Sequence, residues 1–248
     1  MSIGQKIIHL ESVDSTNNYA AKLLSEGRIG HGTVLLADEQ TSGRGQRWTK
    51  WSSATSENLL FSIVLQPDNL SVSEQCVLTE ITSIALVQFL RKFGISAKIK
   101  WPNDILVNGE KIAGVLIENQ LRGSQISSSI VGIGLNVNQK TFELPSIVSI
   151  VNHIDQNFLD LNEVLLSFLA SYLTVWNDYI QNGKSFIRNC YLEHLYQLHE
   201  TAIYQDTEGK FEGKIIGVSE NGLLQIQKEN NVKTYDLKEI KFIYRNAF

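Results

Sequence analysis

The chain is organised around one glycine-rich stretch at residues 41–51, Thr41-Ser42-Gly43-Arg44-Gly45-Gln46-Arg47-Trp48-Thr49-Lys50-Trp51. Apolar runs flank it at residues 33–37 and 58–65, which predicts a loop between two strands. Glycines let the backbone approach a ligand closely, and the arginines and lysine gather positive charge beside it. That combination suits a phosphate or a carboxylate. Taken by itself, the stretch is equally well interpreted as a basic surface loop anchored by two buried tryptophans.

Length and composition bound what the protein can be. A chain of 248 residues can form one large domain, or a domain with a small module. Its net charge of −4 argues against a sequence-independent grip on nucleic acid. Cys76 and Cys190 lack metal-ligand spacing and are predicted to be buried free thiols in a reducing compartment. Residues 1–10 do not resemble a signal peptide, and no apolar run reaches the about 18 residues that span a bilayer. We therefore expect a soluble, cytoplasmic protein without a membrane partner.

The pattern of apolar residues alternates between strand and helix signals. Strands are predicted at residues 6–10, 33–37 and 59–65, and helices at residues 19–24, 74–93, 160–181 and 186–198. After Thr201 the texture changes to short β-type runs separated by turns, at residues 202–204, 209–218, 223–227 and 232–237. This tail predicts a small β-barrel module.

A polar cluster, Ser15-Thr16-Asn17, precedes the first predicted helix. Such residues cap helices, because their side chains accept hydrogen bonds from the first backbone N–H groups. The second interpretation is that these hydroxyl and amide groups bind a polar ligand. Both interpretations stay open at this point.

A second cluster of charged residues surrounds a predicted hairpin turn at residues 108–109, Asn-Gly. A two-residue loop pairs Leu106 with Lys111 and Asp104 with Ala113. Strand alternation then places Asp104 and Lys111 on one face, as diagonal neighbours about 7–8 Å apart. They are interpreted either as a partly exposed ion pair or as a lysine aimed at a ligand's negative charge.

Glycines recur where a ligand would need room. Gly114 follows the hairpin, and Gly132 and Gly134 lie within a buried-looking strand, which predicts close approach of another backbone or a ligand. The sequence after Gly134 does not continue a dinucleotide-binding fingerprint, and the chain has no Walker A sequence. Any ATP is therefore not held by a P-loop.

Taken together, these motifs resemble the biotin–protein ligase family, in a form lacking the N-terminal DNA-binding domain. The matching motifs follow the family order over essentially the whole chain: Asp14-Ser15-Thr16-Asn17, Gln40 with residues 42–47, Lys100-Trp101-Pro102-Asn103-Asp104, residues 111–118, and Gly132-Ile133-Gly134-Leu135-Asn136. The resemblance implies an α+β fold: a mixed β-sheet with flanking helices, as in class II aminoacyl-tRNA synthetases, at residues 1–198. A C-terminal SH3-like β-barrel is implied at residues 199–248.

The resemblance also implies a two-step reaction. Biotin's carboxylate attacks the α-phosphate of MgATP, giving biotinyl-5′-AMP and pyrophosphate. A lysine of a biotin carboxyl carrier domain then takes the biotin and releases AMP. Because carboxylate and triphosphate repel each other, fixed positive groups are the expected device for bringing them together.

Residue roles follow from the motif positions. The resemblance implies Lys111 and Arg44 as catalytic groups. It implies a biotin site of Ser15, Thr16, Asn17, Gln40, Gly43, Arg44, Gly45, Gln46, Trp51, Lys111 and Gly114. It implies an ATP or adenylate site of Arg47, Lys100, Asn103, Asp104, Gly134 and Asn136. Asp104 either orients Lys111 or helps to hold Mg²⁺, and these roles stay open.

Two departures from the family pattern stand in the loop. Gln46 occupies a position where many relatives carry a second arginine, which predicts weaker retention of the charged intermediate unless Arg47 compensates. Trp48-Thr49 stands where a small or basic pair is common, so the loop's shape is left open.

Partners and rival functions follow from the same motifs. Only a short segment precedes the Asp14 motif, so we expect a ligase that does not bind DNA, as a monomer or a homodimer. The rival functions are a lipoate or octanoyl ligase-type enzyme and a non-catalytic biotin-binding sensor.

Overall fold

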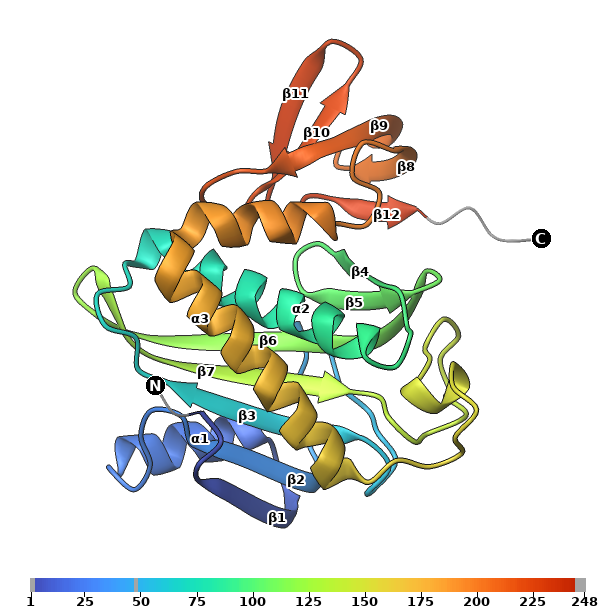
Figure 1. Cartoon of the computed structure of the whole chain (residues 1–248). Helices are drawn as coiled ribbons and strands as arrows, with labels where there is room; N and C mark the ends of the chain where they lie inside the picture. Colours follow the sequence, from blue (N-terminus) through green and yellow to red (C-terminus); the bar gives the residue numbers. More distant parts are fainter. Residues whose placement is uncertain (1–2, 47–48, 244–248) are drawn as a thin grey trace.

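A mixed, seven-stranded β-sheet forms the larger part of the molecule (Figure 1). The computed structural model describes residues 3–46 and 49–243. The strand order is β1-β2-β3-β7-β6-β5-β4, and β1 and β2 are parallel whereas the other neighbours are antiparallel. The strands are β1 (Ile7–Val13), β2 (Val34–Gln40), β3 (Leu59–Leu65), β4 (Ala97–Lys100), β5 (Asp104–Val107), β6 (Glu110–Arg122) and β7 (Gln125–Leu135). The predicted α+β class is confirmed.

Helices cover the two faces of this sheet unequally. Strand residues alternate between faces, so that Val34 and Leu36 of β2 join one apolar cluster and Leu35 joins another. The first cluster lies under α2 (Cys76–Arg91) and α3 (Leu161–Glu193), and the second lies under α1 (Thr16–Ser25). Short 3₁₀ turns occur at Val72–Glu74 and Ile150–Asn152. No helix of the described chain is long and apolar enough to cross a membrane.

Some helices and strands begin or end at other residues than predicted, because pairing with a neighbouring strand sets their limits. The first strand extends to Val13, beyond the predicted residues 6–10, because its end pairs with Gln40 of a lengthened β2. The predicted helices at 160–181 and 186–198 form one bent run, in which Gly183 takes φ 77° and ψ 179° (Figure 1). The prediction of helix up to residue 198 is wrong. The helix ends at Glu193, because the chain after it pairs with the edge of β4.

The C-terminal residues form a separate, five-stranded antiparallel sheet (Figure 1). Its strands are β8 (Thr201–Asp206), β9 (Gly209–Val218), β10 (Leu224–Lys228), β11 (Asn231–Tyr235) and β12 (Lys241–Ile243). The order is β11-β10-β9-β8-β12. The predicted runs correspond to β8 through β11, whereas β12 was not predicted, since three residues are too short to show alternation.

A largely buried ion pair between α2 and α3 lies at the contact with the C-terminal sheet. Arg188 of α3 lies 2.6 Å from Glu80 of α2, and the exposed fractions of the two side chains are 18% and 5%. The same guanidinium donates to two backbone carbonyls, those of Val218 at the end of β9 and of Ser219 in the β9–β10 connection. Trp101, next to β4, donates its indole N–H to the Gly222 carbonyl of that connection at 2.9 Å. The C-terminal sheet is thus fastened to α3 and to the end of β4.

Both cysteines are free, as predicted, but the prediction that they are buried is wrong. Cys76 is the first residue of α2, where it contacts the β9–β10 connection through the Glu220 carbonyl and remains partly exposed. Partial burial raises the pKa of the Cys76 thiol above its ordinary value.

We predict that Arg188→Met lowers the free energy of unfolding by about 3–5 kcal/mol, because it leaves the Glu80 carboxylate buried without its partner. Burial already raises the pKa of Glu80 above its ordinary 4.5. A carboxyl whose pKa is raised in the folded state lowers the free energy of unfolding once the pH exceeds its ordinary value of 4.5. The loss of unfolding free energy in the variant should therefore become smaller as the pH falls toward 4.5. Urea unfolding across this pH range measures both effects.

Lys184→Met is the matched control, because it breaks the exposed pair between Lys184 of α3 and Glu74 of the 3₁₀ turn that precedes α2. We expect that change to cost less than about 1 kcal/mol. Equal losses for the two variants would contradict the proposed importance of the buried pair.

Candidate functional site

A pocket of about 630 Å³ opens on the sheet face that carries α1. Its floor is made of glycines on paired strands, since Gly114 of β6 lies opposite Gly134 of β7. A Cβ atom at Gly132 would lie 2.3 Å from Asn17 Oδ1, and one at Gly134 would lie 2.4 Å from the Trp51 ring. The predicted close approach at these glycines is therefore present, and two side chains, those of Asn17 and Trp51, make it.

Most of the predicted site residues meet in this pocket. Its lining includes Ser15, Thr16, Asn17, Gln40, Arg44, Gly45, Gln46, Trp51, Lys100, Asn103, Asp104, Lys111, Gly114, Gly134 and Asn136. Gly43, which the structure describes, lies outside this lining and accepts a hydrogen bond from the Trp51 N–H at 3.0 Å. Arg47 and Trp48 lie outside the described residues.

Other lining residues were not among the predicted site residues. Those within or beside the predicted motifs are Thr49, Lys50, Ser52, Trp101, Pro102, Val115, Leu116, Gly132 and Ile133. Leu144 and Ile147 come from the segment after β7, Leu237 and Ile240 from the β11–β12 connection, and Lys241 and Phe242 from β12. Motif adjacency could have indicated the first group. The others carry no sequence signal, because tertiary packing alone brings the segment after β7 and the C-terminal part of the chain to the pocket.

The glycine-rich stretch is a loop between β2 and β3, as predicted. It folds back on itself, since the Gly45 N–H donates to the Thr49 carbonyl at 2.6 Å and Arg44 forms a bridge with Lys50. This turn brings Trp51 across the glycine floor, within 3.0 Å of a Cβ placed on Gly114. The loop therefore supplies one wall of the pocket.

Hydrogen bonds to the sheet hold the polar cluster at the start of α1. Thr16 donates its N–H and its hydroxyl to Gln40 Oε1, at 2.8 and 3.1 Å. Ser62 Oγ, from β3, lies 2.7 Å from both Thr16 Oγ1 and Asn17 Oδ1. Ser15 occupies the N-cap position without a side-chain capping bond. The buried side chains of this cluster thus face the sheet and the pocket, which disfavours the capping interpretation.

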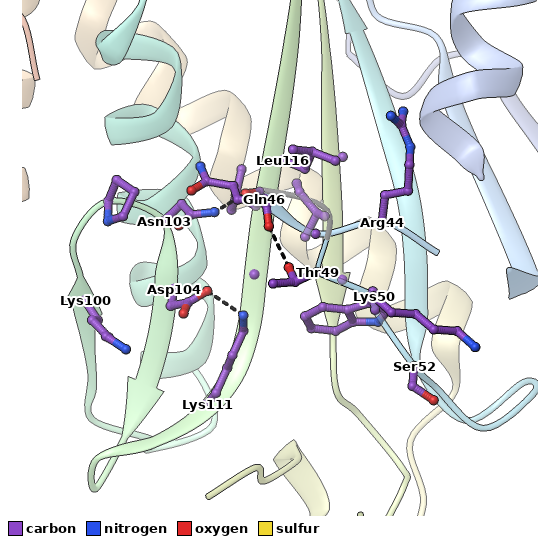
Figure 2. A pocket seen from close by; sticks show the side chains of 18 of the residues that line it. Arg44, Gln46, Thr49, Lys50, Ser52, Lys100, Asn103, Asp104, Lys111 and Leu116 are labelled. Atoms are coloured by element: carbon purple, nitrogen blue, oxygen red, sulfur yellow. Dashed lines mark hydrogen bonds and ion pairs between the residues drawn. The ribbon is translucent and has the colours of Figure 1, made fainter. Parts of the chain in front are cut away.

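Arg44 forms an ion pair with a carboxylate of the protein itself, that of Glu118. Its Nη2 atom lies 2.9 Å from both carboxylate oxygens of Glu118 and 2.6 Å from Asn18 Oδ1. Figure 2 shows the Arg44 side chain pointing away from Lys111 and Asp104. The Asn18 amide also donates to Asp14, and this bond holds the pKa of the Asp14 carboxyl below its ordinary value.

Lys111 and Asp104 form the other charged group, and their side chains point toward one another (Figure 2). Lys111 Nζ lies 2.5 Å from Asp104 Oδ1 and 5.4 Å from the centre of the Trp51 ring. The predicted pairing of Leu106 with Lys111 is confirmed. The predicted pairing of Asp104 with Ala113 is wrong, because an irregularity after Ile105 shifts the register and places Asp104 opposite Gly114.

Positive charge is concentrated in the pocket. The lysines and arginine of the described lining are Arg44, Lys50, Lys100, Lys111 and Lys241, and its one carboxylate is Asp104. The chain as a whole carries a net charge of −4, so this excess is local. A concave site with such a field favours an anion with several charges.

Metal-binding capacity is small. Within the described residues, no group of three or more His, Cys, Asp or Glu side chains is placed to hold a metal ion. Magnesium used with a nucleotide needs only one or two carboxylates beside the phosphate oxygens. Asp104, the single carboxylate of the described pocket lining, fits that requirement.

Comparisons with known proteins place this chain in a family. Residues 9–136 match the model of the biotin/lipoate A/B protein ligase family. The bifunctional ligase/repressor BirA of Bacillus subtilis is 30% identical over 236 residues, which cover 93% of this chain and 72% of the relative. The biotin–[acetyl-CoA-carboxylase] ligase of Paracoccus denitrificans is 32% identical over 230 residues, or 87% of this chain and 91% of the relative.

The chain belongs to the biotin/lipoate A/B protein ligase family. Among solved structures, the biotin protein ligase of Aquifex aeolicus in complex with biotin and ATP superposes with a TM-score of 0.78 at 29% identity. The match covers 97% of this family member and all of the Aquifex chain, so it includes the C-terminal sheet. The predicted fold, a mixed sheet with flanking helices and a C-terminal SH3-like β-barrel, is confirmed.

We predict that Gly134→Ala displaces the Trp51 ring, because the added Cβ would lie 2.4 Å from it. Overpacking of this kind costs about 1–3 kcal/mol. The indole N–H signal of Trp51 in an NMR spectrum, assigned through Trp51→Phe, reports the displacement. Gly30→Ala is the control, since its Cβ would meet only a flexible glutamine tip at 3.4 Å. An unmoved Trp51 signal in Gly134→Ala would contradict the glycine's role.

Proposed function

We propose that this chain is a biotin–protein ligase, which activates biotin with MgATP to biotinyl-5′-AMP and transfers the biotin to a lysine of a biotin carboxyl carrier domain. The observation that carries the proposal is a cationic pocket in which the Lys111–Asp104 pair faces a polar cluster across a glycine floor. The names of the relatives support it, since the Paracoccus protein is named as a biotin–[acetyl-CoA-carboxylase] ligase.

The first step needs two anions to meet. Biotin's carboxylate oxygen attacks the α-phosphorus, and the bond from that phosphorus to the bridging oxygen of pyrophosphate breaks. Lys111, held by Asp104 at the pocket floor, stabilises the charge that develops at phosphorus, and Arg44 orients the carboxylate. Lys100 lies on the same wall and draws the phosphates toward Lys111. Mg²⁺, held by Asp104 and the phosphate oxygens, would neutralise further charge.

The second step is an acyl transfer. The neutral amine of the carrier lysine attacks the acyl carbon of biotinyl-5′-AMP, the bond to the phosphate oxygen breaks, and AMP leaves as the amine loses a proton. Holding the intermediate in a fixed orientation accelerates this step, because the attacking amine then meets a correctly presented carbon.

Biotin's polar ring is assigned to the end of the pocket beside α1. Ser15, Thr16, Asn17 and Gln40 supply hydroxyl and amide groups there, and each is at least partly buried. Hydroxyl and amide oxygens can accept more than one hydrogen bond, so the bonds to Ser62 and Gln40 leave capacity for a ureido group. Trp51 supplies the apolar wall between the two ends.

The adenylate is assigned to the end that carries Asn103, Asp104, Gly134 and Asn136. Asn136 Nδ2 donates to the Val148 carbonyl at 3.0 Å, so a contact from Asn136 to the nucleotide would use Oδ1. Gly45 and Gln46 lie on the loop over this end, where their backbone would close on the intermediate.

We also propose that the chain divides into a catalytic domain at residues 1–198 and an SH3-like domain at residues 199–248. The His199 N–H donates to the Ile215 carbonyl of β9, so the chain has joined the C-terminal sheet at that residue. The pocket lining drawn from residues 237–242 gives the second domain a share in the site.

Biotin-dependent exchange of pyrophosphate into ATP tests the adenylation step. We expect exchange in the wild type and a loss of about 10²–10³-fold in Lys111→Ala, the usual effect of removing one donor that stabilises a transition state. Lys98→Ala is the matched control, because Lys98 is an exposed lysine of β4. Biotin binding without exchange in the wild type would instead support the sensor function.

Substrate choice between biotin and lipoate needs its own experiment, because the family model includes both ligases. Competition between biotin, lipoate and octanoate for adenylate formation separates them. We expect biotin to be used and the two fatty acids to compete weakly.

We predict that the amides of residues 43–46 exchange hydrogen rapidly in the empty protein and become protected when biotin and ATP are both present. Such loops have few buried contacts to hold them until a ligand closes them. Hydrogen-exchange mass spectrometry measures the change, with the buried β3 peptide as an internal reference. Equal exchange in the two states would contradict ordering of the loop over the intermediate.

A further inference from the structure

Glu118 is a charged residue beside the pocket to which the reaction assigns no role. We infer that Glu118 is a positioning residue that holds Arg44 in the empty site and gives it up to the anionic ligand. The inference rests on the proposed function for the identity of that ligand, a carboxylate that becomes an acyl phosphate.

The carboxylate reaches its place through strand alternation. Gly114, Leu116 and Glu118 succeed one another on the same face of β6, which is the face that forms the pocket floor. Glu118 therefore stands one step beyond the floor, beneath the start of α1, where its Oε2 accepts from Asn17 Nδ2 at 2.8 Å. The same carboxylate accepts from Arg44. One side chain thus links two residues assigned to biotin.

The ion pair between Glu118 and Arg44 has the geometry of a weak pair that a ligand oxyanion can replace. Both carboxylate oxygens of Glu118 meet a single nitrogen, Nη2, rather than the two parallel N–H donors of a bidentate pair. Arg44 Nε is buried and has no hydrogen-bond partner within the described chain. The exposed side-chain fractions, 34% for Arg44 and 39% for Glu118, place the pair among weak, solvent-screened ion pairs. A ligand oxyanion that binds two guanidinium nitrogens would replace it.

Repulsion among the cations of the pocket explains why a carboxylate stands beside Arg44. Arg44 shares the pocket with Lys111 and other lysines, which repel it. Glu118 offsets that repulsion and draws Arg44 toward Asn18, away from Lys111 (Figure 2). The ligand's own charge later takes over this function. The guanidinium is thus held at the edge of the pocket, beside Asn18 and Glu118.

Glu118→Gln tests the exchange, because it keeps an acceptor for Asn17 and removes the charge that competes for Arg44. In the empty protein we expect the amides of residues 43–46 to exchange about two- to five-fold faster than in the wild type, in line with the strength of such pairs. With bound biotinol-5′-AMP, a non-transferable analogue of the intermediate, their exchange should equal that of the wild type.

Because Glu118 competes with the ligand for Arg44, removal of its charge should strengthen ligand binding. Affinity for biotinol-5′-AMP is expected to rise about two- to five-fold at low salt, and the gain should vanish at high salt as the charges are screened. In turnover, KM for biotin falls and kcat stays close to the wild-type value. A role that is only structural would instead speed exchange in both states and weaken binding.

Glu74→Gln is the matched control, because the Glu74–Lys184 pair has a similar length, 2.8 Å, and lies outside the pocket lining. It should leave loop exchange and binding unchanged. Weaker binding by Glu118→Gln, or unchanged loop exchange in its empty form, would overturn the inference. Wild-type protein that binds no biotinol-5′-AMP would overturn the proposed function instead. Loop exchange in the empty proteins needs no ligand, so it would still decide whether Glu118 holds Arg44.

Discussion

The structure depends on a floor without side chains. Gly114 and Gly134 are paired on neighbouring strands, and Gly132 lies one step further along β7. A Cβ at Gly132 would lie 2.3 Å from a side-chain atom of Asn17, and one at Gly134 would lie 2.4 Å from the Trp51 ring. Both distances are far shorter than van der Waals contact. These glycines let the start of α1 and the Trp51 ring both come down onto the sheet. The pocket, its polar end and its apolar wall all follow from that approach.

The C-terminal sheet is attached to the larger sheet partly through residues that line the pocket. Trp101 lines the pocket and also donates to the β9–β10 connection, so the wall of the site and the joint between sheets share one side chain. Lys100, its neighbour, lies 5.4 Å from the centre of the Phe242 ring of β12. The Arg188–Glu80 pair fastens the same connection from the other side. The position of β12 over the pocket is therefore set by contacts that also shape the site.

Local chemistry made much of this predictable from sequence. The Asn-Gly turn fixed the pairing of Leu106 with Lys111, and the glycine-rich stretch identified its loop, because both signals lie within a few residues. The shift that places Asp104 opposite Gly114 could not be foreseen, since it depends on how β6 fits both neighbours. Phe242 and Leu144 were missed for a related reason. Each joins the site through tertiary packing and has no motif of its own.

The cations assigned to the reaction are paired with carboxylates of the protein itself. Two cations assigned to the reaction, Lys111 and Arg44, each rest on a carboxylate of the protein, Asp104 and Glu118. Such pairing keeps a cationic pocket stable within a chain of net charge −4. It also means that binding an anion exchanges one ion pair for another, so the gain in affinity is smaller than the pocket's charge suggests. What the arrangement secures is position, because each cation is held at the pocket by a carboxylate before the ligand binds.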